Sequence, residues 1–174
     1  MSDSNYSGFP EFDVGVSNQD IENLLHDALD GLSEEIEIQY WPNAHKLDGS
    51  LKLGGWIDLY TYEDVNLRAN ELQLIHLGVA MKLPEMYEAI IAPRSSTFKN
   101  WGILQANSFG VIDNQFCGPA DAWMFAAYPT KTVFVPRNTR LCQFRIQPIQ
   151  PPIKFKEVKK LSGPNRNGFG SSGL

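Results

Sequence analysis

Residues 107–118 read Asn-Ser-Phe-Gly-Val-Ile-Asp-Asn-Gln-Phe-Cys-Gly. The short apolar run Val111-Ile112 predicts a strand, and Asp113 then starts a turn that ends in an aromatic residue and a glycine. Similar short runs, separated by Pro, Gly and Asn, follow one another along most of the chain. Regular short strands with turn signals predict an all-β sandwich or barrel.

The expected strands extend over most of the chain. They are residues 35–40, 56–60, 71–76, 79–83, 87–92, 109–112, 123–128, 132–135 and 141–147. In the first of them, Ile36, Ile38 and Tyr40 alternate with polar residues, which indicates a strand with one solvated face. The order of these runs shows no βαβ alternation and no internal repeat.

The N-terminal part of the chain has a different pattern. Residues 1–16 are polar, contain Gly and Pro, and are expected to be poorly ordered. Residues 17–33 predict a helix capped by Ser17, with apolar residues on one stripe. This helix either packs on the protein's own core or docks on a neighbouring subunit or another protein. Residues 34–162 are then the β-domain, and residues 163–174 a flexible, Gly/Ser-rich tail.

Composition limits the class of protein. A chain of 174 residues suits one domain with a real core. The net charge of −5 gives no general attraction to nucleic acid or to an anionic membrane. The sequence has neither an apolar run long enough to span a membrane nor a secretory signal pattern. Two cysteines without metal-type spacing indicate free thiols and a cytoplasmic protein, and three scattered histidines make a zinc site improbable.

Five short segments, in chain order, carry the residues suited to polyphosphate chemistry. They supply carboxylates, arginines, small hydroxyls and glycines that expose backbone N–H groups, and they are residues 54–59, 92–96, 107–118, 137–143 and 166–173. This constellation resembles the five ordered motifs of the trimeric dUTP pyrophosphatases (dUTPases). The resemblance implies a jelly-roll-like β-barrel, a homotrimer with shared active sites, Mg²⁺ as cofactor, and hydrolysis of dUTP to dUMP and pyrophosphate.

The resemblance assigns the base, the sugar and the attacking water to residues 107–118. Asp113 corresponds to the carboxylate that directs water at the α-phosphorus; as a lone residue it would be an ordinary turn former. Phe116 corresponds to the ring that excludes a ribose 2′-hydroxyl; the alternative is a core residue. Asn107, together with the hairpin backbone at Gly110 and Ile112, corresponds to the groups that read uracil; the alternative for Asn107 is a plain turn residue.

A second group corresponds to the phosphate ligands of the family. Arg94, Ser95 and Ser96 follow an expected strand, and arginine suits phosphate because its planar fork donates two hydrogen bonds at once. Gln143 corresponds to a residue that reaches the phosphates or the water. Arg140 is either a phosphate ligand or a structural residue.

One carboxylate is assigned to the metal. By the resemblance, Asp58 holds Mg²⁺ through water, or alternatively orients Arg94. Magnesium retains several waters and needs few protein carboxylates when phosphates supply ligands.

The C-terminal tail carries the residues of a lid. Arg166, Ser171 and Ser172 correspond to phosphate ligands, and Phe169 to a ring that stacks on the base. Closure of such a segment would exclude water and complete the charge clamp. Trp123 is the alternative for the stacking aromatic. In the family the tail serves a site formed by other subunits.

Two other functions compete with this interpretation. A dCTP deaminase shares the fold but needs a glutamate just beyond the sugar-contacting aromatic, and no glutamate lies between Asn114 and Phe134. A regulatory or protein-binding trimer would use the same scaffold, with the N-terminal helix as its contact surface.

Overall fold

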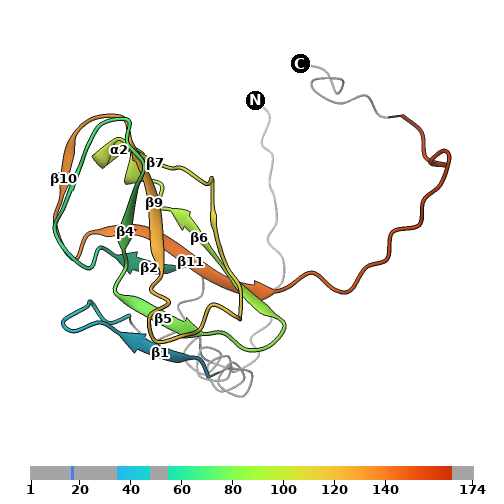
Figure 1. Cartoon of the computed structure of the whole chain (residues 1–174), viewed down its shortest axis with the longest axis horizontal. Helices are drawn as coiled ribbons and strands as arrows, with labels where there is room; N and C mark the ends of the chain where they lie inside the picture. The colour runs from blue at the N-terminus through green and yellow to red at the C-terminus, as the bar shows by residue number, and fades with distance from the viewer. Residues whose placement is uncertain (1–16, 18–34, 48–54, 166–174) are drawn as a thin grey trace, which may run out of the picture.

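The computed structural model describes residue 17, residues 35–47 and residues 55–165. Within these ranges the chain is mostly β-strand (Figure 1). The strands are β1 (Glu37–Tyr40), β2 (Ile57–Tyr60), β3 (Val65–Leu67), β4 (Gln73–His76), β5 (Val79–Lys82), β6 (Tyr87–Pro93), β7 (Ile103–Gln105), β8 (Gly110–Ile112), β9 (Met124–Pro129), β10 (Val133–Val135) and β11 (Arg140–Pro148). A short helix, α2 (Thr97–Trp101), follows β6.

The strands pair antiparallel in four sheets. The orders are β2-β11-β6-β8, β4-β9-β7, β1-β5 and β10-β3. The two larger sheets share one core: Ile91 and Phe144 from the first pack in the same buried cluster as Ile75 and Phe125 from the second. Sheet-on-sheet packing of this kind buries the inward residues of both layers and leaves the alternate residues outside.

The long strand β11 is the centre of the four-stranded sheet. It pairs with β2 on one side and with β6 on the other. The register with β2 shifts between Arg140 and Cys142, which makes Leu141 the extra residue of a β-bulge. The bulge explains why two successive side chains, Leu141 and Cys142, are both fully buried.

The expectation of an all-β fold is confirmed, and the expected jelly-roll-like barrel is not closed within the described residues. Their pairing stops at four separate sheets because several strands are only three or four residues long and turn away before another ladder forms. The short elements β3, β7 and α2 were not expected from the sequence. No helix in the described ranges is long and apolar enough to cross a membrane.

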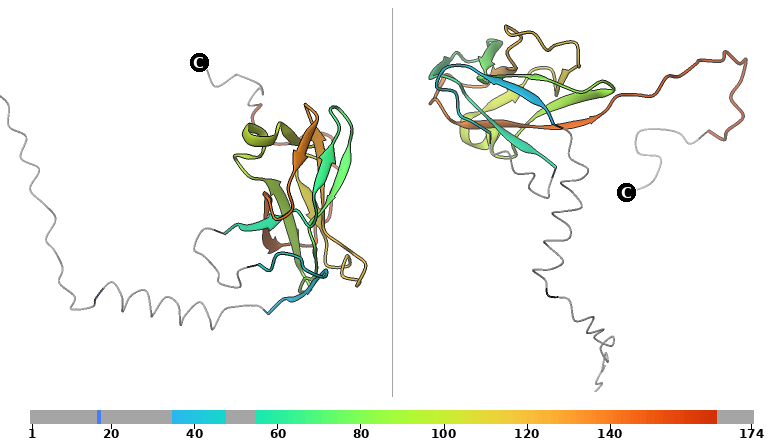
Figure 2. Two further views of the ribbon diagram at one scale, coloured as in Figure 1. Left: turned by 90° about the vertical axis from the view of Figure 1, so that its left-hand side faces the viewer. Right: turned by 90° about the horizontal axis from the view of Figure 1, so that it is seen from below.

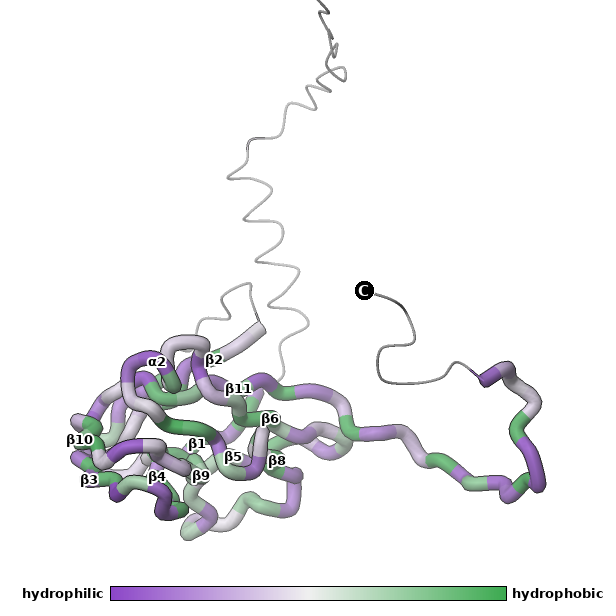
Figure 3. Tube along the Cα trace, turned by 90° about the horizontal axis from the view of Figure 1, so that it is seen from above, coloured by the Kyte–Doolittle hydropathy of each residue, from purple (hydrophilic) through white to green (hydrophobic). Residues whose placement is uncertain are grey.

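Several expectations concern residues outside the described ranges. They are residues 1–16, the predicted helix apart from Ser17, and the tail from residue 166 onward. The described chain from Ile149 is anchored once, by the Ile149 N–H to the Met86 carbonyl at 2.8 Å. Residues 151–165 are then all exposed and run away from the body (Figures 1 and 2). Polar and apolar residues alternate along this segment (Figure 3).

Candidate active site

Three strands bring an arginine, a carboxylate and an amide to one end of the four-stranded sheet. Gln143 of β11 lies opposite Asp58 of β2 and, on its other side, opposite Ala92 of β6. Arg94 directly follows β6, and its backbone N–H points to the Leu141 carbonyl at 3.5 Å. The residues that the sequence assigned to phosphate and metal are therefore neighbours. We call Asp58, Arg94, Arg140 and Gln143 the arginine cluster.

Two ion pairs converge on one carboxylate in the arginine cluster. The Arg94 Nε lies 2.8 Å from Asp58 Oδ1, and the Arg140 Nη1 lies 3.5 Å from Asp58 Oδ2. The Asp58 and Arg94 side chains are 27% and 28% exposed, whereas Arg140 is 57% exposed. Two cations share one anion, so a positive charge is left over. Because Arg94 uses its Nε, both its terminal nitrogens can donate to a ligand.

The two serines lie where β6 passes into α2. The Thr97 hydroxyl donates to the Leu141 carbonyl at 2.5 Å, and the Thr97 N–H donates to the Arg94 carbonyl at 3.0 Å. These bonds hold the turn that carries Ser95 and Ser96. Ser96 is the residue before the helix, and its side chain makes no capping hydrogen bond, so its hydroxyl remains available to a ligand. The anchoring role of Thr97 could not be predicted, because its partner Leu141 lies 44 residues further along the chain.

The hairpin segment, residues 107–118, contributes the edge strand β8 to the four-stranded sheet. Gly110 pairs with Ile91 of β6, and a Cβ at Gly110 would lie 3.3 Å from the Ile91 Cβ. The Gln105 amide donates to the Ile91 carbonyl at 3.3 Å, while Gln105 Oε1 is buried with no partner among the described residues. Gln105 thus ties β7 to β6 under the hairpin segment, and sequence analysis missed it because a single glutamine in an apolar run has no pattern.

Asp113 organises the turn after β8. Its Oδ1 accepts the N–H of Gln115 at 2.8 Å and the N–H of Phe116 at 3.1 Å. The interpretation of Asp113 as a turn former is therefore correct for its Oδ1 atom. Within the described chain Oδ2 has no such bond, and the side chain is exposed. Asp113 can hold its own turn and still present one oxygen to a water molecule.

The other residues of the hairpin segment are also accessible. Phe116 is 39% exposed and lies outside the buried cluster, so the interpretation of Phe116 as a core residue is wrong. Asn107 is exposed in a turn, where its carbonyl accepts the Phe109 N–H at 2.6 Å. Ile112 is partly buried and packs against the core cluster.

The arginine cluster and Asp113 lie far apart within one chain. Ile112 pairs with Ala89 near the start of β6, whereas Arg94 follows the end of β6. A strand of seven residues at about 3.3 Å per residue separates the two by roughly 20 Å. The structure thus brings the phosphate and metal candidates together and keeps them away from Asp113, whereas Gly110 in the same hairpin segment pairs with Ile91, three residues before Arg94.

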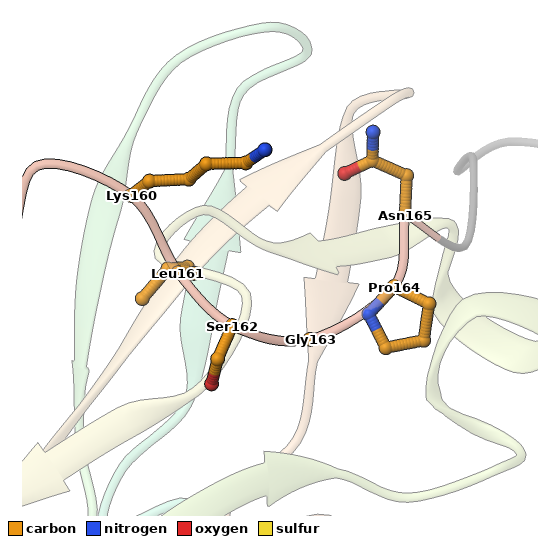
Figure 4. A pocket seen from close by; sticks show the side chains of 6 residues that line it. All are labelled: Lys160, Leu161, Ser162, Gly163, Pro164 and Asn165. Atoms are coloured by element: carbon orange, nitrogen blue, oxygen red, sulfur yellow. The ribbon is translucent and has the colours of Figure 1, made fainter.

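Two other features of the described chain do not contribute to the site. Trp123 is 0% exposed and packs edge-to-face on Phe144 at 5.2 Å, so the alternative that Trp123 covers the base is wrong. A hollow between Lys160 and Asn165 is lined by consecutive residues of the exposed segment alone (Figure 4). The remaining lid candidates, Arg166, Phe169, Ser171 and Ser172, lie outside the described residues.

Among the described residues, the candidate metal ligand is the single carboxylate of Asp58. The described residues include no cluster of three or more His, Cys, Asp or Glu side chains. The Asp58 carboxylate is a partly exposed hard-oxygen donor beside two arginines. This arrangement fits a magnesium ion that arrives with phosphate oxygens and water, with the protein contributing one carboxylate.

Comparisons with known proteins agree on one family. A family model described as dUTPase matches residues 55–173. The SPbeta prophage-derived deoxyuridine 5'-triphosphate nucleotidohydrolase YosS of Bacillus subtilis (strain 168) is 43% identical over 139 residues, which are 80% of this chain and 98% of that protein. The deoxyuridine 5'-triphosphate nucleotidohydrolase of Hydrogenobaculum sp. (strain Y04AAS1) is 35% identical over 121 residues, 68% of this chain and 83% of its own.

Solved structures share the fold. A mutant dUTPase of Staphylococcus bacteriophage 80alpha with dUpNHpp superposes with a TM-score of 0.67 at 18% identity, covering 82% of this chain and all of that one (100%). A mutant dUTPase from phage phi11 of S. aureus, described with a structural Mg(II) ion, gives 0.62 at 18% identity over 73% of this chain and 98% of its own. With the family model and the relatives in agreement with the fold, the chain belongs to the dUTPase family.

Proposed function

We propose that this protein hydrolyses dUTP to dUMP and pyrophosphate with Mg²⁺, and so keeps uracil out of DNA and supplies dUMP. The observation that carries this proposal is the match of the dUTPase model over residues 55–173, because that range includes both the arginine cluster and the hairpin segment. Relatives over this range are named deoxyuridine 5'-triphosphate nucleotidohydrolases.

The arginine cluster binds the triphosphate in this proposal. Arg94, held through Nε by Asp58 at 2.8 Å, turns its terminal nitrogens to phosphate oxygens. Neutral hydrogen-bond donors to the phosphates come from Ser95, Ser96 and Gln143. Because these side chains carry no charge, binding through them does not require another charged group to lose its water. Bound Mg²⁺, reached by Asp58 through water, would neutralise charge on the leaving pyrophosphate. Arg140, more exposed and more distant from Asp58, strengthens the positive field.

The hairpin segment binds the nucleoside and directs the water. Asp113 orients and partly deprotonates the water through the oxygen that its own turn does not use. The exposed ring of Phe116 packs on deoxyribose and leaves a 2′-hydroxyl without a partner, which is costly when buried. Asn107 and the backbone from Gly110 to Ile112 read the uracil edge.

A working site then needs more than one copy of the chain. Within one chain roughly 20 Å of β6 separates Arg94 from Asp113, which is too far for one bound nucleotide's phosphates and attacking water to use both. We therefore propose a homotrimer in which one subunit supplies the arginine cluster and another the hairpin segment. The exposed run of residues 151–165, which leads away from its own body, supports the proposal that Arg166, Phe169, Ser171 and Ser172 close a site on other subunits.

The reaction is tested by substrate comparison. Pyrophosphate release is measured in parallel from dUTP, dCTP, dTTP and UTP with Mg²⁺, and repeated with a chelator. We expect release from dUTP alone, and loss of that release when Mg²⁺ is removed. Ammonia release from dCTP without pyrophosphate would instead identify a deaminase.

The shared site is tested by mixing inactive subunits. Arg94→Ala and Asp113→Asn chains should each be nearly inactive as pure proteins. A mixed trimer contains some sites with an intact arginine cluster from one chain and an intact Asp113 from another, so part of the activity should return. Subunit exchange demonstrated by native mass spectrometry without any recovered turnover would place both residues in one chain's own site.

A further inference from the structure

Gln105, the last residue of β7, is a polar side chain on the core side of its sheet. Side chains alternate along a strand, and Ile103, two residues earlier, is 1% exposed, whereas Leu104 between them is 48% exposed. The cross-strand partner of Gln105 is Ala127 of β9, which is 0% exposed. The pattern of this sheet would therefore place an apolar side chain at position 105.

Two contacts of Gln105 hold the start of the hairpin segment. Its side-chain amide donates to the Ile91 carbonyl at 3.3 Å, and a Cβ at Gly110 would lie 3.5 Å from the same nitrogen. Its backbone carbonyl accepts the Ser108 N–H at 3.2 Å, across the turn that carries Asn107. Ser108 has a φ of 61°, a left-handed conformation that costs energy in a residue other than glycine. One residue thus braces both the hairpin backbone at Gly110 and the strained turn before it.

The other end of the Gln105 amide is left unpaired. Gln105 Oε1 is buried and has no hydrogen-bond partner among the described residues. A buried acceptor without a partner lowers stability, because the hydrogen bond that water gave it in the unfolded chain is not replaced. A side chain that costs stability at a core-facing position is expected to serve function instead.

Gln73 of β4 is a matched comparison on the same sheet. It faces Ala127 from the opposite side of β9, and it is half-buried like Gln105. Gln73 Oε1 accepts the Arg68 N–H at 2.7 Å, and Gln73 Nε2 donates to the Asn66 carbonyl at 3.4 Å. Both ends of its amide are therefore paired, as expected of a glutamine that only stabilises a loop.

We propose that Gln105 is a positioning residue for selection of the base. This inference rests on the proposed function, in which Asn107 and the backbone at Gly110 read the uracil edge. Donors and acceptors that read a base edge must be held within about 0.5 Å of their working positions. The Gln105 amide holds them from the core side, through its contacts with the Ile91 carbonyl and Gly110 and without touching the nucleotide.

The place of Gln105 predicts which kinetic constant it affects. The turn of Asp113 is held by its own carboxylate, through the N–H groups of Gln115 and Phe116, so the attacking water stays directed when Gln105 is changed. Loss of the brace under Gly110 should weaken binding of the base and relax the choice of uracil over cytosine. The KM should therefore change, whereas kcat should not.

The substitution Gln105→Leu tests the inference, because leucine removes both ends of the amide and suits a core-facing position. We expect the KM for dUTP to rise about tenfold with kcat within about threefold, and the ratio of kcat/KM for dUTP over dCTP to fall about tenfold. Thermal unfolding should occur at an unchanged or higher temperature, because an unpaired acceptor has been removed. If Gln105→Leu does not fold, Gln105→Met, unbranched and also without a donor, is measured in its place.

The matched control is Gln73→Leu. It gives up two hydrogen bonds outside the site, so the unfolding temperature should fall while the KM and the base ratio stay within about twofold. The base ratio decides: an unchanged ratio in Gln105→Leu, or an equally large loss in Gln73→Leu, would overturn the inference.

Failure of the proposed function gives a different result. An unaltered protein that releases no pyrophosphate from dUTP would overturn that function, and calorimetry with non-hydrolysable analogues of dUTP and dCTP would then decide the role of Gln105. A preference for the uracil analogue that Gln105→Leu relaxes would support the inference, and a preference that persists would overturn it. A protein that binds neither analogue would overturn both.

Discussion

The arginine cluster and the hairpin segment are positioned in different ways. Asp58 and Gln143 belong to neighbouring strands, so the β-ladder fixes their spacing, and the ion pair to Asp58 fixes Arg94. Asp113 and Phe116 lie in a turn held by the carboxylate of Asp113 itself. The arginine cluster, proposed to bind phosphate, is thus built into the sheet, whereas the position of Asp113, the proposed catalytic residue, depends on two hydrogen bonds within its own turn.

The largest effect should come from Asp113→Asn. Asparagine keeps an oxygen that accepts the Gln115 and Phe116 N–H groups, so the turn survives while the base is lost. Turnover of dUTP should fall at least about a thousandfold, with binding of a non-hydrolysable analogue within about tenfold. Turnover is measured by pyrophosphate release, and binding of the analogue by isothermal titration calorimetry. Retention of most of the turnover would remove Asp113 from catalysis and leave it a turn former.

Thiol reactivity compares how open the two regions are. Cys117 is exposed in the hairpin segment, whereas Cys142 is buried next to Gln143. Burial, and secondarily the nearby Asp58 carboxylate, raise the pKa of the Cys142 thiol, so its thiolate is absent at neutral pH. A disulfide reagent should modify Cys117 at least about a hundredfold faster than Cys142. Equal rates in the folded protein would mean that the sheet beside the arginine cluster opens readily.

Arg94 and Arg140 should differ in importance although both contact Asp58. Arg94→Lys loses the planar fork and should lower kcat/KM by roughly thirtyfold. Arg140→Lys, at the longer 3.5 Å contact and 57% exposed, should change it by less than about threefold. Both pairs are partly solvated, so the unfolding free energy should change by under about 1 kcal/mol. Equal losses in kinetics would make Arg140 a phosphate ligand in its own right.

The smallest effect should be on sugar selectivity. Phe116→Ala removes the ring that disfavours a 2′-hydroxyl, and the ratio of kcat/KM for dUTP over UTP should fall by about tenfold. Phe134→Ala is the control, since Phe134 is 49% exposed on β10, outside the hairpin segment. An unchanged ratio in Phe116→Ala would assign deoxyribose selection to another group.

Much of the fold could be predicted because its longer strands carry clear alternation and turn signals. The expected runs 87–92 and 141–147 fall within β6 and β11. Four strands have only three residues, too few to show a periodicity: β8 and β10 were predicted as apolar runs beside turn residues, whereas β3 and β7 were missed. Helix α2 has five residues, too few to show an apolar stripe at helical spacing, although a serine stands at its N-cap position.

The site was predictable in composition but not in arrangement. Two roles were predicted for Asp58, and its ion pair with Arg94 matches the one in which it orients that arginine. The order of the motifs along the chain does not reveal that Arg94 and Asp113 lie near opposite ends of β6. Their separation follows from the antiparallel register of β8 on β6. Contacts such as Gln105 to the Ile91 carbonyl join residues 14 apart in sequence and leave no local pattern.

The course of β11 has a mechanical consequence. This strand of nine residues continues through Ile149, which is still bonded to Met86, into the exposed segment of residues 151–165. Its hydrogen bonds to β2 and β6 run across the strand, so a pull along the segment loads many of them in shear at the same time. Tension along residues 149–165 is therefore shared by the whole ladder before it reaches Gln143, so this segment can be loaded while Gln143 and Asp58 keep their register.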